Sequence, residues 1–375
     1  MQLQVDPAAY GDRPRSDGVA VPARQNSNPR QPLIVLNRRA ATRPTITGVE
    51  RFTDAVIGRL AALGPDRYVV AEPRPRARGR LRAQAWEQAV LPARAARQRA
   101  ALVFSPANLA PLAWPRNVLV MHDAAVLREP EAYSRAYRAW HARVGVAGAR
   151  RAVAVITVSE FSRRELIELA GLDPTRLTVI PGGVDARFAP DADPAPAAAR
   201  LGLSRPYVLT IATDDRRKNL EKLAPVAAAL AREGVELVWA GDRRPYFAAA
   251  AAAAGVRSLG YVADTELPGL YAGARAFVLA SRYEGFGLTC LEAMGCGTPV
   301  VAADRAALPE TCGDAALLVD PDDGEALAAT VLRAVSDPAL RGDLRRRGLA
   351  RARGFSWDET AARVDALLSE LAGAR

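Results

Sequence analysis

Short apolar runs rich in β-branched residues alternate with helix-length segments along most of this chain, and this alternation is the strongest constraint on its fold. Residues 153–158 and 207–212 are runs of this kind. Strands that alternate with helices through short loops form parallel sheets with right-handed crossovers. At 375 residues the chain also exceeds the usual size of a single core. We therefore predict an α/β protein with two doubly wound, Rossmann-like domains that face each other across a cleft.

The predicted elements follow directly from these runs. We expect strands at 33–36, 68–71, 101–104, 117–122, 153–158 and from 177, and then at 207–212, 236–241, 258–261, 276–280, 299–303 and 316–319. Helices are expected at 49–60, 86–99, 132–150, from 159, at 219–232, near 245–254 and 264–274, from 288, and from 356. The basic run 74–82 is expected to be an exposed loop.

Composition shifts suggest where the domains begin and end. Residues before 32 are polar, carry Pro and Arg, and lack periodicity, which is typical of a disordered leader. A Pro- and Ala-rich stretch at 191–197 favours a linker. We expect the last helix to pack back toward the N-terminal domain. The predicted ranges are a leader at 1–31, domains at 32–190 and 206–355 joined by a linker at 191–205, and a crossover helix at 356–375.

The segment 281–294 is the predicted centre of the functional site. It follows an apolar strand and passes through a glycine-containing loop into a helix near Leu288. Such a helix start directs free backbone N–H groups at an anion, and the helix dipole adds to the attraction. Glu284 and Glu292 bracket the turn. Phosphate held at a helix start, with acids directed at hydroxyl groups on either side, fits a nucleotide sugar.

Two other interpretations of Glu284 and Glu292 were weighed. As the acid and base of a glycosidase, they would be eight residues apart, or about 12 Å along a helix. Paired hydrolase carboxylates lie roughly 5–9.5 Å apart, so this spacing does not favour hydrolysis. Alternatively, Glu284 is a helix cap and Glu292 an ordinary helix residue. The apolar neighbours of Glu292 argue against that reading, because an unpaired carboxylate there would be costly.

Further candidate residues lie at the ends of predicted strands. Arg217 and Lys218 follow the first strand of the second half and can neutralise a diphosphate, although a solvated basic turn is the simpler reading. His122 and Asp123 follow another strand, where open α/β sheets bind ligands. His122 there can donate to a sugar hydroxyl or polarise a leaving group, or it can be purely structural. Ser159 is interpreted first as a helix cap.

Composition narrows the class of protein. The net charge is +10, and residues 1–200 hold 30 arginines and no lysine against 18 acidic residues. This surplus indicates a weak preference for a membrane surface or an anionic acceptor, or no function at all. Three cysteines and two histidines make a structural zinc site improbable. Without a signal pattern or a membrane-length apolar run, we expect a cytoplasmic protein that is at most peripheral at the inner face of the membrane.

With these residues in view, the chain resembles the family-four retaining glycosyltransferases, which have the two-Rossmann-domain (GT-B) architecture. It is most similar to the bacterial mannosyltransferase-like branch that builds lipopolysaccharide and exopolysaccharide. The resemblance runs from residue 33 to the C-terminus. It rests on an ordered set of motifs: Gly48-Val-Glu-Arg-Phe, His122-Asp123, Val158-Ser-Glu-Phe-Ser-Arg-Arg-Glu-Leu, Val179-Ile-Pro-Gly-Gly-Val-Asp, Arg217-Lys-Asn, Glu284-Gly-Phe-Gly-Leu with Glu292, and Gly297-Thr-Pro-Val-Val.

The resemblance implies a role for each candidate residue. In the C-terminal, donor-binding domain, Arg217 and Lys218 would hold the diphosphate of a nucleotide sugar, with a GDP-mannose-like donor favoured, and Glu292 would bind the ribose. Glu284 would grip the sugar together with the backbone amides that follow it, at Gly285, Phe286, Gly287, Leu288 and Thr289. From the N-terminal, acceptor-binding domain, the residues facing the sugar and a glycan or lipid-linked acceptor would be Gly48, His122, Asp123 and Ser159.

The resemblance also bears on chemistry and on alternatives. It implies no cofactor and no metal, with His122, Glu284, Arg217 and Lys218 as the catalytic set. Ala212 and Gly183 depart from the family pattern, which often has Gly and Asn there. A nucleotide-sugar epimerase or a pyridoxal-dependent sugar phosphorylase would share the architecture. A basic nucleic-acid-binding protein is the non-enzymatic alternative, but the spread of the arginines over many loops leads us to expect no nucleic-acid partner.

Overall fold

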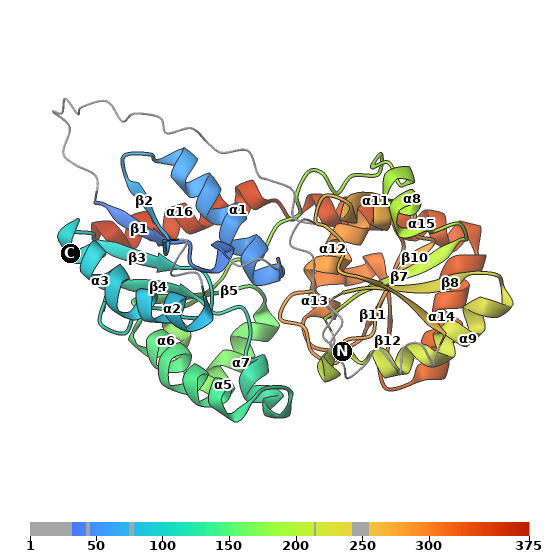
Figure 1. Cartoon of the computed structure of the whole chain (residues 1–375), viewed down its shortest axis with the longest axis horizontal. Helices are drawn as coiled ribbons and strands as arrows, with labels where there is room; N and C mark the ends of the chain where they lie inside the picture. The colour runs from blue at the N-terminus through green and yellow to red at the C-terminus, as the bar shows by residue number, and fades with distance from the viewer. Residues whose placement is uncertain (1–31, 43–45, 75–78, 214, 242–254, 375) are drawn as a thin grey trace, which may run out of the picture. The chain divides into compact units, whose positions relative to one another are not determined.

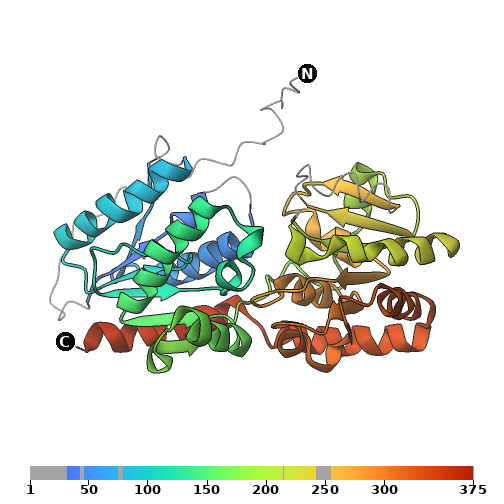
Figure 2. The same ribbon diagram turned by 90° about the horizontal axis from the view of Figure 1, so that it is seen from below.

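The computed structural model describes residues 32–42, 46–74, 79–213, 215–241 and 255–374. Its first six strands form one parallel sheet in the order β2-β1-β3-β4-β5-β6. Helices lie on both faces of this sheet (Figures 1 and 2). The strands are β1 (Ile34–Asn37), β2 (Tyr68–Ala71), β3 (Leu102–Ser105), β4 (Asn117–Val120), β5 (Ala154–Thr157) and β6 (Leu177–Val179).

The next six strands form a second parallel sheet in the order β12-β11-β10-β7-β8-β9. They are β7 (Tyr207–Ile211), β8 (Glu236–Ala240), β9 (Val256–Gly260), β10 (Ala276–Leu279), β11 (Val300–Ala303) and β12 (Ala316–Val319). Both sheets are doubly wound, which confirms the predicted fold class. In this sheet the order of the strands reverses between β7 and β10. Ligands of open α/β sheets bind beside such a switch point, at the carboxyl ends of the strands.

The strands form because their residues are buried on both faces. All four residues of β1, β3, β4 and β5 are buried, as are those of β10 and β11. Continuous apolar runs with many β-branched residues are typical of parallel strands covered by helices on both sides. These strands were predicted to within one or two residues at each end.

Helices in the first half are α1 (Gly48–Leu63), α2 (Arg80–Ala85), α3 (Leu91–Arg97), α4 (Ala125–Arg128), α5 (Arg135–Trp140), α6 (Ala147–Arg151) and α7 (Glu160–Ala170). Two π-helical segments, η4 (Trp86–Val90) and η6 (His141–Val146), continue α2 and α5. The prediction of a loop at 74–82 is therefore wrong for its last three residues, 80–82, which belong to α2. Arg80 opens this helix because the Leu-Arg-Ala-Gln-Ala sequence that follows consists of good helix formers.

Helices in the second half are α8 (Ala195–Leu201), α9 (Ala224–Arg232), α11 (Leu267–Ala272), α12 (Leu288–Gly295), α13 (Leu308–Cys312), α14 (Gly324–Ser336), α15 (Pro338–Arg353) and α16 (Trp357–Gly373). Helix α8 lies inside the predicted linker, and α13, α14 and α15 were not predicted. The expected helix near 245–254 lies outside the described residues. The five domain ranges proposed from the sequence stay predictions.

The C-terminal helix α16 packs against α1 and β3 of the first half, as predicted. Its buried residues Trp357, Val364 and Leu368 share a core with Phe52 and Leu60 of α1. Before the helix, Ser356 pairs with Val184 in an isolated parallel bridge. A side chain at Gly183 would place its Cβ 2.1 Å from the backbone nitrogen of Trp357. The crossover therefore explains the glycine at a position where the resembled family often has asparagine.

Candidate functional site

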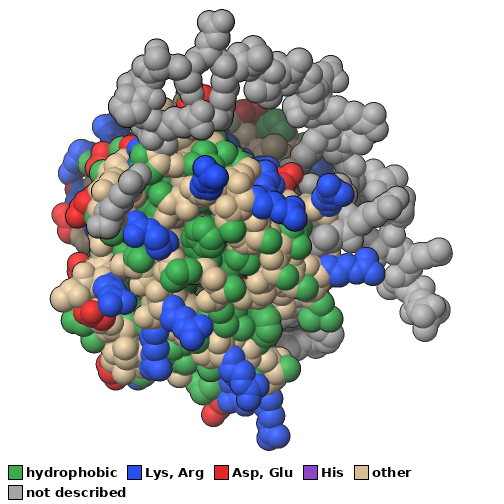
Figure 3. All heavy atoms as spheres, turned by 90° about the vertical axis from the view of Figure 1, so that its left-hand side faces the viewer, with side chains coloured by type: hydrophobic (Ala, Val, Ile, Leu, Met, Phe, Trp, Pro, Cys, Tyr) green, Lys and Arg blue, Asp and Glu red, His purple; other side chains and the backbone are tan. Residues whose placement is uncertain are grey.

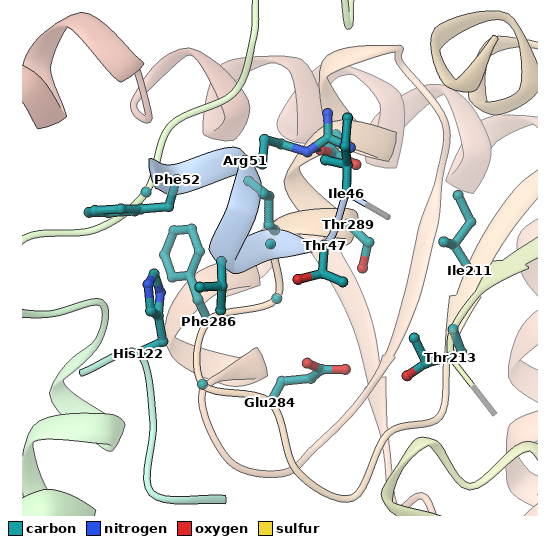
Figure 4. Close-up of a pocket in the computed structure, with 18 of the residues that line it drawn as sticks. Ile46, Thr47, Arg51, Phe52, His122, Ile211, Thr213, Glu284, Phe286 and Thr289 are labelled. Carbon is teal, nitrogen blue, oxygen red and sulfur yellow. Dashed lines mark ion pairs between the residues drawn. The ribbon is translucent and has the colours of Figure 1, made fainter. Parts of the chain in front are cut away.

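A cavity of about 380 Å³ is lined by residues from both halves of the chain (Figure 4). The structure brings together in its lining every site residue predicted from the sequence except Ser159. From the first half these are Gly48, His122 and Asp123. From the second half they are Arg217, Lys218, Glu284, Gly285, Phe286, Gly287, Leu288, Thr289 and Glu292. The cavity also contains Arg51, which the sequence analysis did not single out.

The loops after β7 and β10 carry the charged end of the cavity. The loop after β7 turns at Asn219, which has a positive φ of 56° and donates from Nδ2 to the carbonyl of Pro321 at 2.7 Å. The N–H of Arg282, in the loop after β10, donates to the carbonyl of Arg217 at 2.8 Å. Because β7 and β10 are neighbours at the switch point, the two loops meet there. The basic pair and Glu284 are placed by this topology.

Lys218, Arg217 and Glu284 form a half-buried ionic cluster. Nζ of Lys218 lies 2.5 Å from Oε1 of Glu284, and Nη1 of Arg217 lies 3.9 Å from Oε2. Arg217 also pairs with Asp215 at 3.1 Å and donates to the carbonyl of Tyr283 at 3.2 Å. Two cations beside one cavity carboxylate make a site that favours an added anion.

The pKa values of this cluster follow from burial and charge. Burial lowers the pKa of Lys218 despite the neighbouring Glu284. For Glu284, burial works to raise the pKa, but the charges of Lys218 and Arg217 outweigh it and the net shift is downward. Glu284 is therefore held ionised, as an acceptor for hydroxyl groups.

Helix α12 begins at this cluster. Gly287 precedes it with a φ of +94°, and a Cβ there would lie 2.6 Å from Cδ2 of Leu308, so the turn requires glycine. The first N–H groups of a helix have no partners within it. Together with the helix dipole they attract an anion. Leu288 and Thr289 thus bring backbone donors to the same end of the cavity as Lys218.

Gly285 touches the first half of the chain. A Cβ on Gly285 would lie 2.7 Å from Cβ of Asp123 and 2.8 Å from the carbonyl oxygen of His122. Ser159 does not line the cavity. It caps α7 by accepting from the N–H of Ser162 at 3.0 Å, and it donates to the carbonyl of Gly285 at 2.6 Å. The structure therefore places Ser159 as a support for the loop that carries Glu284, behind the cavity wall.

Glu292 marks the other end of the cavity and is 2% exposed. Its Oε2 accepts from the hydroxyl of Tyr271 at 3.1 Å, and its Oε1 lies 3.3 Å from Nε of Arg51. Nη2 of Arg51 lies 2.6 Å from Oδ1 of Asp264. Burial raises the pKa of Glu292, and the charge of Arg51 opposes that rise. The sequence analysis quoted Arg51 within the motif Gly48-Val-Glu-Arg-Phe but gave it no role, because it occupies an ordinary polar position of an amphipathic helix.

His122 is buried at the wall formed by the first half, with its ring 5.0 Å from that of Phe52. Its Nε2 lies 2.9 Å from the carbonyl oxygen of Pro106. Burial lowers its pKa, so the ring is neutral. Because a carbonyl oxygen only accepts, Nε2 carries the proton and Nδ1 is left as an acceptor. The expected donation from His122 to a sugar hydroxyl is thus corrected: with this bond in place, its free nitrogen accepts.

The other expectations concern His141, metal ions and the membrane. His141, interpreted as packing or surface, is buried, and its Nδ1 has no hydrogen-bond partner among the described residues.

In the part of the chain that the structure describes, no group of three or more His, Cys, Asp or Glu side chains is placed to hold a metal ion. The expectation of a metal-free site stays a prediction. None of the helices within the described ranges is long and apolar enough to cross a bilayer.

Two doubly wound sheets, with a helix start and flanking carboxylates in a cavity that both halves line, are the arrangement of the two-domain glycosyltransferases and of the enzymes that share their architecture. Comparison with known proteins identifies the family. Residues 46–188 match the model "Glycosyltransferase Family 4", and residues 205–337 match "Glycosyl transferases group 1". The chain belongs to the family-four glycosyltransferases, as the sequence motifs predicted, and it has their GT-B fold. It is a glycosyltransferase.

Individual relatives are more distant. The chain is 34% identical over 265 residues to O-antigen chain mannosyltransferase B of Escherichia coli, a match spanning 65% of this chain and 67% of that protein. It is 36% identical to D-inositol 3-phosphate glycosyltransferase of Salinispora arenicola over 52% of this chain and 50% of that protein. The match thus spans between half and two thirds of these relatives.

Solved structures share the fold. Sucrose-phosphate synthase from Thermosynechococcus elongatus superposes with a TM-score of 0.74 at 23% identity, covering 92% of this chain and 100% of that one. Anabaena HepE in complex with UDP-glucose superposes with a TM-score of 0.70 at 22% identity, covering 90% of this chain and 99% of that one. Family membership favours group transfer over the epimerase, phosphorylase and nucleic-acid-binding alternatives.

Proposed function

We propose that this glycosyltransferase moves a mannosyl or related deoxyhexosyl group from a nucleotide sugar to a lipid-linked or oligosaccharide acceptor in cell-surface polysaccharide synthesis, with retention of configuration. One observation carries the proposal: Lys218, Arg217 and the start of α12 lie at one cavity between two carboxylates, the half-buried Glu284 and the buried Glu292. Relatives named as mannosyltransferases support mannosyl transfer, and the name O-antigen chain mannosyltransferase B supports a glycan acceptor. We propose a GDP-mannose-like donor on the resemblance of the sequence motifs.

In this proposal each end of the cavity binds a different part of the donor. Arg217 and Lys218 neutralise the diphosphate, with the N–H groups that open α12. Glu284, held ionised, accepts from sugar hydroxyls beside them. Glu292 lies four residues beyond Leu288, about 6 Å further along the helix, and accepts from the ribose. This order matches the sequence sugar, diphosphate, ribose along a nucleotide sugar.

The first half supplies the acceptor side. Gly48 opens α1 at the cavity, and nothing lies within 4 Å of where its Cβ would be, so a substrate can approach the backbone there. His122 accepts from a hydroxyl through Nδ1, and Asp123 lies beside it in the cavity wall. Neither residue is required as the base. The acceptor hydroxyl attacks the anomeric carbon as the bond to the diphosphate breaks, and its proton passes to a departing phosphate oxygen.

Catalysis then depends on positioning and on electrostatic stabilisation. Negative charge accumulates on the leaving diphosphate, where Lys218, Arg217 and the N-terminus of α12 are already oriented. The residues present can supply this without a metal ion, so we propose a metal-free reaction that uses no cofactor.

We also propose peripheral contact with an anionic membrane surface through the first half. The face that turns α3 and the C-terminus toward the viewer carries basic side chains spread among apolar ones (Figure 3), and those of the first half are all arginines. Leu63, Leu81 and Val90 of the first half are exposed large apolar residues. A basic surface interspersed with apolar side chains suits the cytoplasmic leaflet, where a lipid-linked acceptor would be found.

Turnover of labelled nucleotide sugars tests this function. Purified protein is incubated with GDP-mannose, GDP-fucose or UDP-glucose and a glycolipid extract, and the anomeric configuration of the product is read by NMR. We expect transfer from a GDP-hexose with retention. The same assay on Lys218→Ala and Glu284→Ala should show strong loss. Turnover unchanged in both variants, or an inverted product, would contradict the proposal.

A further inference from the structure

Arg51 is the one arginine of the first half that reaches the proposed ribose end of the cavity in the described structure. It lies on α1, beside the acceptor side, yet its guanidinium contacts two carboxylates of the second half, Glu292 and Asp264. The guanidinium carbon also lies 5.6 Å from the centre of the Phe188 ring. These contacts fix the head group across the junction between the two halves (Figure 4).

These contacts leave hydrogen-bonding positions unused on both Glu292 and Arg51. A carboxylate has about four acceptor positions. Tyr271 and Arg51 occupy one on each oxygen of Glu292, so two remain. Nη1 of Arg51 is buried and has no hydrogen-bond partner among the described residues. A hydroxyl group both donates and accepts. A ribose hydroxyl can therefore donate to Glu292 and accept from Nη1 of Arg51 at the same time.

We propose that Arg51 completes the ribose site from the acceptor-binding half, by pairing with Glu292 and by donating a hydrogen bond from Nη1 to a ribose hydroxyl. This inference rests on the proposed function and extends it. The diphosphate end is assembled by one half of the chain, whereas the ribose end requires both. Binding of the nucleotide thereby favours the arrangement in which Gly48 and His122 face the donor sugar.

The charges around Glu292 show why Arg51 matters. The groups facing it are Arg51 from α1, Tyr271 from α11, Cys296 directly after the end of its own helix, and Asp264 and Arg187 from the loops beside it. Burial and Asp264 disfavour the ionised carboxylate, and Arg51 is the largest opposing charge. Arg187 is already paired with Asp264. Without Arg51, Glu292 should take up a proton at a higher pH and lose acceptor capacity.

The experiment measures how much the ribose hydroxyls contribute to nucleotide affinity, by comparing each nucleotide with an analogue that lacks them. Calorimetry measures the affinities of GDP and 2′,3′-dideoxy-GDP, with UDP and 2′,3′-dideoxy-UDP alongside, from pH 6 to 8.5. The ratio of the two affinities is the contribution of the ribose hydroxyls. It is measured in wild type, Arg51→Met, Arg51→Lys and Glu292→Gln. Arg59→Met is the control, since Arg59 lies on the same helix and pairs with Asp358, away from the cavity.

In wild type we expect a ribose contribution of about tenfold or more, because hydrogen bonds to charged groups are strong. In Arg51→Met this ratio should fall toward one as the pH is lowered and recover in part as it is raised. Arg51→Lys should keep a flat pH profile, and Arg59→Met should match wild type. In Arg51→Met/Glu292→Gln the ratio should be no lower than in Glu292→Gln alone.

Other outcomes separate the inference from the proposed function. If Arg51→Met weakens GDP and dideoxy-GDP equally, Arg51 acts on the phosphates or the base, and the inference is overturned while the function stands. If Arg51→Met changes neither affinity, so that the ratio of the GDP and dideoxy-GDP affinities equals that of wild type, the inference is likewise overturned and the proposed function stands. If neither GDP nor UDP binds wild type, the proposed function fails, and the inference with it. Thermal melts show whether each variant is folded.

Discussion

The two ends of the cavity each hold a glutamate, half-buried Glu284 and buried Glu292, in opposite electrostatic settings. At the Glu284 end, Lys218 and Arg217 come from the same half of the chain, and they lower the pKa of the carboxyl. At the Glu292 end, burial raises the pKa, and the nearest cation, Arg51, comes from the other half. The first end draws its charged groups from one half of the chain, while Ser159 of the other half supports its loop. The second end draws its carboxylate from one half and its nearest cation from the other.

The difference suggests a division of labour. Charge stabilisation of a leaving diphosphate requires groups that are fixed in advance, because reorienting them during the reaction would cost free energy. A site that both halves complete can instead couple nucleotide binding to the position of the acceptor side. The experiments that follow separate the two ends, beginning with the largest expected effect.

Lys218→Met should remove the stabilising charge at the Glu284 end. We expect turnover to fall about 10²–10³-fold, the effect of deleting one preorganised donor from a transition-state site. Lys222→Met is the control, because Lys222 is the only other lysine in the chain and does not line the cavity. Steady-state kinetics with whichever nucleotide sugar is turned over in the assay of wild type measure the effect. Turnover within a few-fold of wild type would show that Lys218 does not act on the diphosphate.

Gly285→Ala should disturb the junction between the halves while leaving the charged cluster in place. The added Cβ would overlap Asp123 and the carbonyl of His122, and overpacking of this kind costs about 1–3 kcal/mol. We expect kcat/KM to fall about tenfold or more and the ribose contribution to shrink, with little change in binding of inorganic pyrophosphate. Gly342→Ala is the control, since nothing lies within 4 Å of its Cβ position. Equal loss of pyrophosphate binding would contradict the division between the two ends.

Diphosphate affinity at the Glu284 end of the cavity should fall at alkaline pH. Burial lowers the pKa of Lys218 below the ordinary lysine value of about 10.4. Only the protonated lysine attracts a diphosphate, so affinity should fall a few-fold as the pH rises through the lowered pKa. Lys218→Arg keeps its charge throughout this range and should not show this fall. Calorimetry between pH 7 and 10 measures it. A fall in affinity that persists unchanged in Lys218→Arg would be assigned to another group.

Much of this site could be predicted from sequence because its parts are local. Gly287 precedes a helix at a positive φ, and the pair Arg217-Lys218 follows a strand, so short patterns encode both. The contact between Arg51 and Glu292 joins residues that are 241 positions apart, and although Arg51 belongs to the motif Gly48-Val-Glu-Arg-Phe, its place on the polar face of helix 49–60 does not indicate a partner. The π-helical turn at Trp86–Val90 also escaped, because the apolar pattern of 86–99 fits an α-helix equally well.

His122 illustrates a second limit of prediction from sequence, which concerns the direction of hydrogen bonds. Its place at the end of β4 was predictable, but its hydrogen-bonding sense depends on Pro106, sixteen residues earlier in the chain. The sequence therefore indicated a functional histidine and left open whether it donates or accepts. Ser159 is similar: the capping role was predicted from its position before a helix, whereas its bond to Gly285 crosses between the halves.

Ser159→Ala should have the smallest effect and tests whether the junction contributes stability beyond an ordinary helix cap. Losing a serine cap costs about 1 kcal/mol. Loss of the bond to the Gly285 carbonyl should add a similar amount, since that carbonyl would keep only the Ser162 hydroxyl at 3.0 Å. Ser134→Ala is the matched control, because Ser134 caps α5 with an exposed side chain and no bond across the junction. Chemical denaturation should show Ser159→Ala to be the less stable by about 1 kcal/mol, with the KM for acceptor unchanged. A raised KM for the acceptor at unchanged stability would instead support the predicted role of Ser159 in acceptor binding.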